Sequence, residues 1–226
     1  IPAENGYYVT QDTEICVSAD NGENEPHPVP GEISFECKGV ELDEDGCFHY
    51  TKDSQHELYC IATDALGNPG SETWNDIVES QAPTTTISYT GPYYNNKGVE
   101  YIDGVSTVVL SADDGQTHPS GVDVTYYKYE IVDDEYCLGE GQWMPTSKEA
   151  LDWEVYETPF SLKESCHVIE YYSVDKLDNK EAVKASFVFV DKTAPETIKE
   201  VGSPSHKCDS AWESVTGKCE EDWDYI

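Results

Sequence analysis

The chain has 226 residues, 38% hydrophobic and 12% aromatic, enough to bury one large core or two smaller ones. Its 46 Asp and Glu residues outnumber 13 lysines, and with no arginine the net charge is −33. A surface this negative repels phosphate backbones, which excludes nucleic acid as a partner. No apolar run approaches the roughly 20 residues that a membrane-spanning helix needs, so we expect no membrane span in this chain.

The first unit that we expect comprises residues 1–80 and consists of strands. Its strand pattern starts at Tyr7, Tyr8 and Val9. Short runs rich in tyrosine, valine, isoleucine and threonine, bounded by glycine, asparagine, aspartate and proline, are typical of β-strands. Residues 64–68 (DALGN) indicate a tight turn, because aspartate accepts backbone hydrogen bonds there and glycine tolerates a left-handed backbone.

The second unit, residues 81–192, repeats motifs of the first in the same order. Residues 13–22 (TEICVSADNG) match residues 106–115 (STVVLSADDG) at an offset of 93. Residues 56–68 (HELYCIATDALGN) match residues 167–179 (HVIEYYSVDKLDN) at an offset of 111. The chain is therefore predicted to hold a tandem repeat.

The second copy is longer than the first, because the two offsets, 93 and 111, differ by 18. We expect these extra residues as a long loop at about residues 133–153, which are rich in glycine, acidic and polar residues. The strand count and spacing then predict an all-β chain of two tandem Ig-like antiparallel β-sandwiches.

Three segments give the chain a family resemblance. The Ser-Ala-Asp-(Asn/Asp)-Gly segment, the Asp-x-x-(Gly/Asp)-Asn turn after a tyrosine-containing strand, and the Ala-Pro-x-Thr opening resemble the Ig-like repeats of prokaryotic surface proteins. The resemblance implies arrays on archaeal or bacterial cell surfaces, in filaments, surface layers and adhesins. Two features depart from the pattern: Asp178 replaces the usual glycine, and the cysteine content is high.

Eight cysteines form an even, dispersed set without a CxxC pair, which is typical of a disulfide framework in a protein outside the cytosol. Cys137 and Cys166 are the two cysteines of the second unit, and we predict that they pair. Cys208 and Cys219 are the two cysteines of the tail, residues 193–226, and we predict the same for them.

The four cysteines of the first unit allow three pairings. We predict Cys16–Cys60 together with Cys37–Cys47. Cys16 and Cys60 both fall in the middle of expected strands, where two sheets could face each other. The short segment between Cys37 and Cys47 spans an expected turn.

The tail repeats the opening of the second unit, because residues 82–87 (APTTTI) recur as residues 194–198 (APETI). The first unit has no such segment ahead of its strand pattern. Either a longer array continues here with a further unit, or the tail adds a strand to the first unit of another copy and builds a head-to-tail filament. The candidate assembly residues are Ala194, Pro195, Thr197, Ile198, Tyr7, Tyr8 and Val9.

Calcium is the one cofactor that the sequence suggests. Asp113, Asp114 and Asp123 fall around one loop of the second unit, and Asp20 falls at the matching loop of the first. Several carboxylates with nearby carbonyls suit a hard cation. The alternative is that these aspartates cap backbone groups in turns, and EF-hand spacing is absent.

Catalytic patterns are missing from the sequence. It has no Gly-x-Ser-x-Gly, His-Glu-x-x-His or P-loop motif, and pairing of all the cysteines would leave no free thiol, so we expect no enzyme. Three tyrosine pairs, at residues 93–94, 126–127 and 171–172, are each expected to place one ring in the core and the other on the surface. The exposed rings could stack on glycans.

We therefore predict a non-enzymatic structural segment of an extracellular filament or surface-layer polymer, located at the cell surface and assembling with itself. The alternative is an adhesin or a glycan-binding stalk module, in which the long insertion forms the contact surface.

Overall fold

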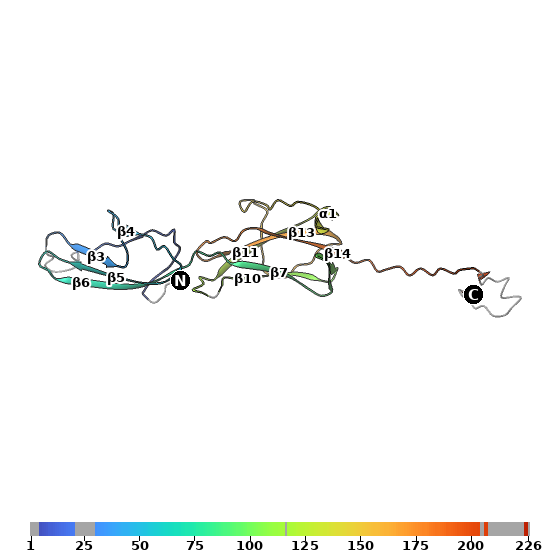
Figure 1. Ribbon diagram of the computed structural model, residues 1–226, viewed down its shortest axis with the longest axis horizontal. Helices are drawn as coiled ribbons and strands as arrows, with labels where there is room; N and C mark the ends of the chain where they lie inside the picture. The colour runs from blue at the N-terminus through green and yellow to red at the C-terminus, as the bar shows by residue number, and fades with distance from the viewer. Residues whose placement is uncertain (1–4, 21–29, 116, 204–205, 208–223, 226) are drawn as a thin grey trace. The chain divides into compact units, whose positions relative to one another are not determined.

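A computed structural model describes residues 5–20, 30–115, 117–203, 206–207 and 224–225. The chain divides into two compact units, residues 1–192 and residues 193–226. The first compact unit holds two β-sandwiches, which precede and follow residues 79–83 along the chain (Figure 1). One short helix is the exception to an all-β fold within the described residues.

The first sandwich pairs a four-stranded sheet with a two-stranded one. Its strands are β1 (Tyr8–Val9), β2 (Ile15–Cys16), β3 (Ser34–Lys38), β4 (Cys47–Phe48), β5 (Ser54–Thr63) and β6 (Pro69–Val78). The large sheet has the order β1-β6-β5-β3, in which β1 is parallel to β6 and the other neighbours are antiparallel. The small sheet is the antiparallel pair β2 and β4.

A small apolar core lies in this sandwich. Strand β5 alternates along its length, so Leu58 and Cys60 are buried on one face. Trp74 of the neighbouring β6 is partly buried against the same cluster. The buried members are Phe48, Tyr50, Leu58, Cys60 and Val78.

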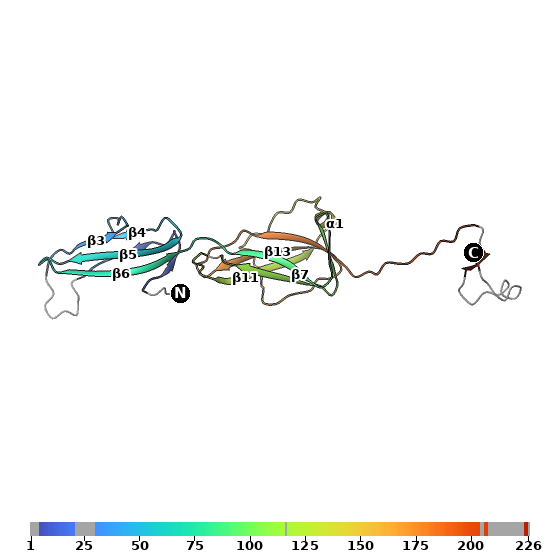
Figure 2. The ribbon, with the colours of Figure 1, turned by 60° about the horizontal axis from the view of Figure 1, so that its bottom comes forward.

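The second sandwich has a larger sheet. Its strands are β7 (Thr84–Thr90), β8 (Tyr93–Asn96), β9 (Val99–Asp103), β10 (Thr107–Asp113), β11 (Val122–Ile131), β12 (Glu154–Val155), β13 (Ser165–Asp175) and β14 (Lys184–Asp191). Six of them form a sheet in the order β12-β11-β13-β14-β9-β8, and β10 pairs with β7 in a second sheet. Strands β11 and β13 of the large sheet and β7 of the second can be followed in Figure 2. The buried core residues are Ile102, Val108, Leu110, Leu162, Ile169, Tyr171, Val188 and Val190.

Each sandwich contains one parallel strand pair among the described residues. In the first sandwich Tyr8 lies opposite Ile77, and in the second Tyr101 lies opposite Phe189, both in parallel pairs. The matching turns also agree, because Asp178 takes the same left-handed conformation (φ 67°) that Gly67 takes in the first copy. The replacement of glycine by aspartate therefore preserves the turn.

The insertion of the second copy packs against its sheet. It begins with α1 (Asp134–Cys137), and Tyr136 stacks on Phe187 of β14 with ring centroids 6.1 Å apart. Trp143 meets the same phenylalanine edge-on at 6.0 Å. Because the insertion covers one face of the sheet and the core covers the other, residues 166–175 of β13 are all buried.

The disulfides of the first sandwich differ from the predicted pairing. Cys16 bonds to Cys47, and Cys37 bonds to Cys60. In each case the two cysteines lie directly opposite each other on neighbouring antiparallel strands, β2 with β4 and β3 with β5. The prediction of Cys16–Cys60 with Cys37–Cys47 is wrong because these bonds link strands within a sheet rather than two facing sheets.

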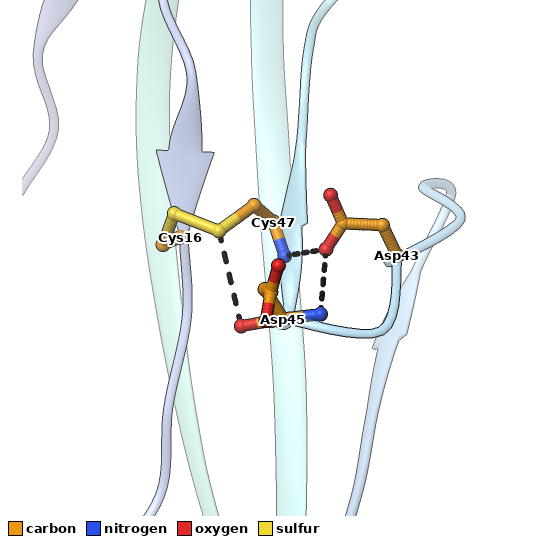
Figure 3. The surroundings of a disulfide bond; sticks show 4 residues. All are labelled: Cys16, Asp43, Asp45 and Cys47. Atoms are coloured by element: carbon orange, nitrogen blue, oxygen red, sulfur yellow. Dashed lines mark hydrogen bonds between the residues drawn. A yellow bond between two sulfur atoms is a disulfide. The ribbon is translucent and has the colours of Figure 1, made fainter.

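The turn before β4 helps to set the Cys16–Cys47 pair. The Asp43 carboxylate accepts hydrogen bonds from the backbone N–H of Asp45 (3.0 Å) and of Cys47 (2.8 Å), as Figure 3 shows. These bonds close the turn and satisfy a Cys47 donor that points away from β2. Aspartate in a turn therefore places the cysteine opposite its partner.

A third disulfide joins Cys137 to Cys166, the pair expected in the second unit. It ties α1 of the insertion to β13. The predicted Cys208–Cys219 bond lies outside the described residues. In the tail, β15 (His206–Lys207) pairs antiparallel with β16 (Asp224–Tyr225). None of the described helical residues forms a segment long and apolar enough to cross a membrane.

Candidate functional site

Strand β2 of the first sandwich has one edge that no strand of the described residues pairs with. The Val17 N–H donates to the Gly46 carbonyl at 3.0 Å, so Val17 turns its backbone groups toward β4. Neighbouring residues on a strand point their backbone groups in opposite directions, so those of Cys16 and Ser18 face away from β4. Within the described part of the first sandwich, no strand pairs with that side.

The equivalent edge of the second sandwich is occupied. There β10 is the counterpart of β2, and Val108 exchanges backbone hydrogen bonds with Phe160 (2.8 and 3.3 Å) on one side. On its other side β10 pairs with all seven residues of β7. Ile87 and Tyr89 of β7 pack against the core. The second sandwich is therefore completed by a strand that follows directly from the first one.

A buried hydrogen-bond network anchors the start of β7. Thr85 is 1% exposed and donates its N–H (2.9 Å) and its hydroxyl (2.6 Å) to the two carboxylate oxygens of Glu181. The Thr85 hydroxyl also lies 2.6 Å from that of Ser173, and Lys184 forms an ion pair with Glu181. Because every one of these polar groups has a partner, the network fixes the position of the strand.

The predicted assembly residues of the first unit have a role inside their own sandwich. Tyr8 and Val9 form β1 and pair with Ile77 and Val78 of β6. Tyr7 contributes its carbonyl to the Ile77 N–H at 2.8 Å. The edge of β2 that is unpaired within the described residues was not singled out by the sequence.

The predicted assembly residues of the tail lie in a segment without strands, residues 193–203. They are Ala194, Pro195, Thr197 and Ile198. The Ile198 side chain is 77% exposed. In β7 the alternate residues Thr85, Ile87 and Tyr89 face inward. The same spacing after Ala-Pro in the tail would turn Thr197, Lys199 and Val201 inward. A lysine at the central inward position fits an apolar core less well than isoleucine does.

Three acidic residues meet at the linker between the sandwiches, and we call them the linker carboxylate group. They are Glu79, which directly follows β6, Asp114, which directly follows β10, and Asp175, the last residue of β13. Carboxylate oxygens of the three lie within 4.8 Å of one another. Glu79 is 4% exposed and Asp175 is 2% exposed.

Several backbone groups hold these carboxylates in place. Asp175 accepts bonds from the N–H groups of Leu177 and Asn179, both 2.8 Å, and from the Asn179 side-chain amide at 2.7 Å. Asp114 accepts a bond from the Gly121 N–H at 2.6 Å. Glu79 accepts one at Oε1 from the N–H of the second residue after it, at 2.9 Å.

Two buried oxygens of the group have no hydrogen-bond donor, Glu79 Oε2 and Asp114 Oδ1. Burial and the neighbouring Asp175 carboxyl raise the pKa of Glu79 to about 7. Burial also raises the pKa of Asp114, against the opposing effect of the Gly121 N–H. Negative charge is therefore concentrated here without enough donors to compensate for it.

Of the four aspartates that the sequence suggested as calcium ligands, one lies in a group of converging carboxylates in the structure. Asp114 belongs to the linker carboxylate group, while the Asp113 carboxylate accepts a bond from the Gly115 N–H at 2.9 Å. Asp123 is exposed on β11, and Asp20 is not part of any group of three metal-ligating side chains among the described residues. Most of the loop after Asp20 lies outside the described residues.

Sequence reasoning missed the other two members, Glu79 and Asp175. Asp175 carried a usable signal, because it opens the turn that matches residues 64–68 of the first copy. Glu79 carried none, since only the fold brings the end of β6 next to two loops of the second sandwich. A second group, Glu14 with Cys16 and Cys47, is no metal site because both sulfurs are in a disulfide.

The aromatic residues of the insertion are occupied in packing. Trp153 meets the Tyr172 ring edge-on at 4.9 Å, and Trp143 donates its ring N–H to Glu170 at 2.9 Å. Tyr171 and Tyr172 are both buried, whereas residues 93–94 are both exposed. The expectation of one buried and one exposed ring is wrong for these two pairs, because the insertion covers the outer face of β13 and no layer covers β8 within the described residues.

The chain matches no known protein family and no curated protein sequence. Among solved structures it is similar to the fibronectin(III)-like modules of Clostridium thermocellum CbhA, at 12% identity over 87% of this chain and 95% of that one, with a TM-score of 0.33. The human desmocollin-1 ectodomain shows 13% identity over 88% and 36% of the two chains, with a TM-score of 0.27.

A third similar structure is SGBP-B of the Bacteroides ovatus mixed-linkage glucan utilization locus, in complex with a mixed-linkage heptasaccharide. It shows 10% identity over 85% of this chain and 67% of that one, with a TM-score of 0.23. At these scores, the assignment of β-sandwiches rests on the strand topology described above.

Proposed function

We propose that this chain is a non-catalytic structural segment of an extracellular filament or surface polymer built from Ig-like β-sandwiches. Successive units are joined by strand addition, so that each unit supplies the strand that completes the next. The observation that carries the proposal is the contrast between β10, whose edge is filled by β7, and β2, whose equivalent edge is free within the described residues.

The geometry of β7 supports this mechanism. Thr84 directly follows the five-residue linker, residues 79–83, so the first sandwich and the completing strand of the second are joined by a short tether. An unpaired strand edge invites pairing with another strand, and main-chain hydrogen bonds supply its affinity. A contact of this kind joins unlike surfaces and does not close on itself, so it extends a fibre.

The disulfides support a location outside the cytosol. All six cysteines among the described residues are paired, three bonds in all. Such bonds form and persist in oxidising compartments. They also suit a mechanical role, because a cross-link within each sandwich limits how far it can extend when pulled.

The test is whether the free edge of β2 binds a strand. Two labelled peptides, residues 80–91 containing β7 and residues 192–203 from the tail, are titrated into the oxidised full chain by fluorescence anisotropy. We expect saturable binding of the residue 80–91 peptide. Ser18→Pro removes an N–H from the free edge without touching the bonds to β4, and should weaken binding about tenfold or more.

Ser18→Ala is the matched control, because it keeps that N–H, and it should bind the peptide like the original chain. Binding of the tail peptide to the same edge would support head-to-tail assembly of separate copies. Binding of the residue 80–91 peptide alone would instead support a covalent array. If neither peptide binds, or if Ser18→Pro binds both unchanged, strand addition at β2 is wrong.

A further inference from the structure

We propose that the linker carboxylate group, Glu79, Asp114 and Asp175, is a calcium site that fastens the linker to the second sandwich. No step of this proposal depends on strand addition at β2. It rests on three carboxylates within 4.8 Å of one another and on two buried oxygens that lack any donor.

The unpartnered oxygens are the observation that points to a ligand. Glu79 is only 4% exposed, so it is more than nine-tenths buried, and its Oε2 has no hydrogen-bond partner. The Asp114 Oδ1 atom is also buried and also lacks a hydrogen-bond partner. A buried carboxylate oxygen without a donor costs free energy, and a cation bound between the carboxylates removes that cost at both oxygens at once.

Within the described part of the chain, no lysine forms an ion pair with these carboxylates. Among the described residues, ion pairs join Lys128 to Asp152, Lys180 to Asp178 and Lys184 to Glu181, and none of these three includes a member of the group. Lys176 lies beside Gly121, so that a Cβ at Gly121 would be 3.1 Å from its ammonium, but it forms no ion pair with these carboxylates among the described contacts.

The donor chemistry selects the cation. All three side chains offer oxygen, and oxygen ligands suit the hard cations calcium and magnesium rather than zinc, which favours nitrogen and sulfur. The three carboxylates come from three separate segments, and each of them accepts at least one backbone N–H. Calcium accepts an irregular ligand set, whereas magnesium demands a near-ideal octahedron.

The consequence of binding follows from where each ligand lies in the chain. Glu79 belongs to the linker, and its backbone N–H donates to the Val9 carbonyl at 2.9 Å. Asp114 and Asp175 belong to loops of the second sandwich. The Asn179 amide already donates to the Glu79 carbonyl at 3.3 Å, so a cation would strengthen an existing attachment of the linker to these loops.

The chain contains a matched control for the turn that carries Asp175. Asp64 in the first copy accepts bonds from Leu66, Asn68 and the Asn68 side-chain amide at 2.9, 2.8 and 2.7 Å. This is the pattern of Asp175, but Asp64 is not part of a carboxylate group among the described residues. Asp175→Asn and Asp64→Asn therefore disturb equivalent turns in the two sandwiches, and only Asp175→Asn removes a proposed calcium ligand.

The experiment is isothermal titration calorimetry of CaCl2, and separately of MgCl2, into the EDTA-treated full chain. Sodium chloride at about 0.15 M suppresses weak binding to the many exposed acids. We expect one saturable calcium site per chain. Glu79→Gln, which keeps the Oε1 acceptor, and Asp175→Asn should each weaken it more than about tenfold, and Asp64→Asn less than about twofold.

A second readout separates loss of a ligand from loss of folding. Calcium should raise the melting temperature of the original chain and of Asp64→Asn, and should leave that of Glu79→Gln unchanged, while circular dichroism without calcium shows all three folded. The proposal is wrong if calcium gives no saturable site, or if Glu79→Gln binds it as tightly as the original chain. Saturable magnesium binding that is as tight as calcium binding would overturn the assignment to calcium.

Discussion

Glu170 shows how a charged residue is accommodated in the middle of a buried strand. It is 1% exposed on β13, where a carboxylate would be costly without partners. The insertion provides them: the Trp143 ring N–H and the Thr146 N–H donate to Oε1 at 2.9 and 2.8 Å, and the Thr146 hydroxyl donates to Oε2 at 2.5 Å. The same three bonds fix the insertion onto the sheet.

Glu170→Ala should lower the free energy of unfolding by about 3 kcal/mol, because it leaves partly buried donors on Trp143 and Thr146 without an acceptor. Chemical denaturation followed by circular dichroism measures this loss. The control is Glu130→Ala on β11, whose side chain is exposed, and it should change stability by less than about 0.5 kcal/mol. Equal effects of the two substitutions would contradict the role given to Glu170.

Buried and partly buried tyrosines make the fold sensitive to alkali. Burial and, to a smaller extent, the hydrogen bond to Glu154 raise the pKa of Tyr127 to about 12. Burial raises the pKa of Tyr50, and the hydrogen bond to Asp76 raises it further. Burial also raises the pKa of Tyr89, and the neighbouring Glu100 carboxylate adds to this increase.

A raised tyrosine pKa means that the folded state favours the neutral phenol. Its stabilising contribution is complete below the unfolded value of about 10 and is lost as the pH rises through the folded value. We therefore expect the melting temperature to fall between about pH 10 and about pH 12. When tyrosine ionisation is monitored by absorbance, Tyr50, Tyr89 and Tyr127 should ionise only as the circular dichroism signal of the folded chain is lost. Full ionisation of all tyrosines in a folded chain would contradict the prediction.

At the scale of elements, strand register decides the disulfides. Cys37 lies opposite Cys60 and Cys16 lies opposite Cys47, so each bond joins neighbouring strands. Sequence spacing alone left three pairings open, because it reports which residues are in strands but not which strands are neighbours. Register is a property of the sheet.

Non-reducing peptide mapping should recover Cys16 linked to Cys47 and Cys37 linked to Cys60. Removing the second bond by Cys37→Ala with Cys60→Ala should cost about 3 kcal/mol of unfolding free energy, since it frees the unfolded chain from a loop. Recovery of a Cys16–Cys60 peptide would show that the register described here is wrong.

At the scale of the whole molecule, the two sandwiches are stabilised differently. Counted over the described residues, the core cluster of the first has five buried members and that of the second has eight, while the first holds two disulfides and the second one. Fewer buried apolar groups mean less hydrophobic stabilisation, so the first sandwich depends more on its cross-links.

A thiol reductant should therefore lower the melting temperature of the first sandwich more than that of the second, and should separate one thermal transition into two. Hydrogen exchange measured by mass spectrometry assigns each transition, with faster exchange expected first in β5 and β6. The oxidised chain is the control. Simultaneous loss of protection in both sandwiches after reduction would contradict this account.

The sequence by itself determined the all-β class, and it predicted the repeat and the position of the insertion. These properties follow from local patterns: alternating β-branched and aromatic residues, turn motifs such as residues 64–68, and a fixed offset between matching motifs. A turn such as the one opened by Asp175 depends on hydrogen bonds within five residues, so it can be recognised from five letters.

The tertiary structure alone decided the disulfide partners, the burial of Tyr171 together with Tyr172, the free edge of β2 and the linker carboxylate group. Each of these depends on residues far apart in the chain, such as Glu79 and Asp175, meeting in space. Contacts of this kind are set by the order and register of strands in the sheets. That order depends on how whole elements pack, which no short stretch of sequence specifies.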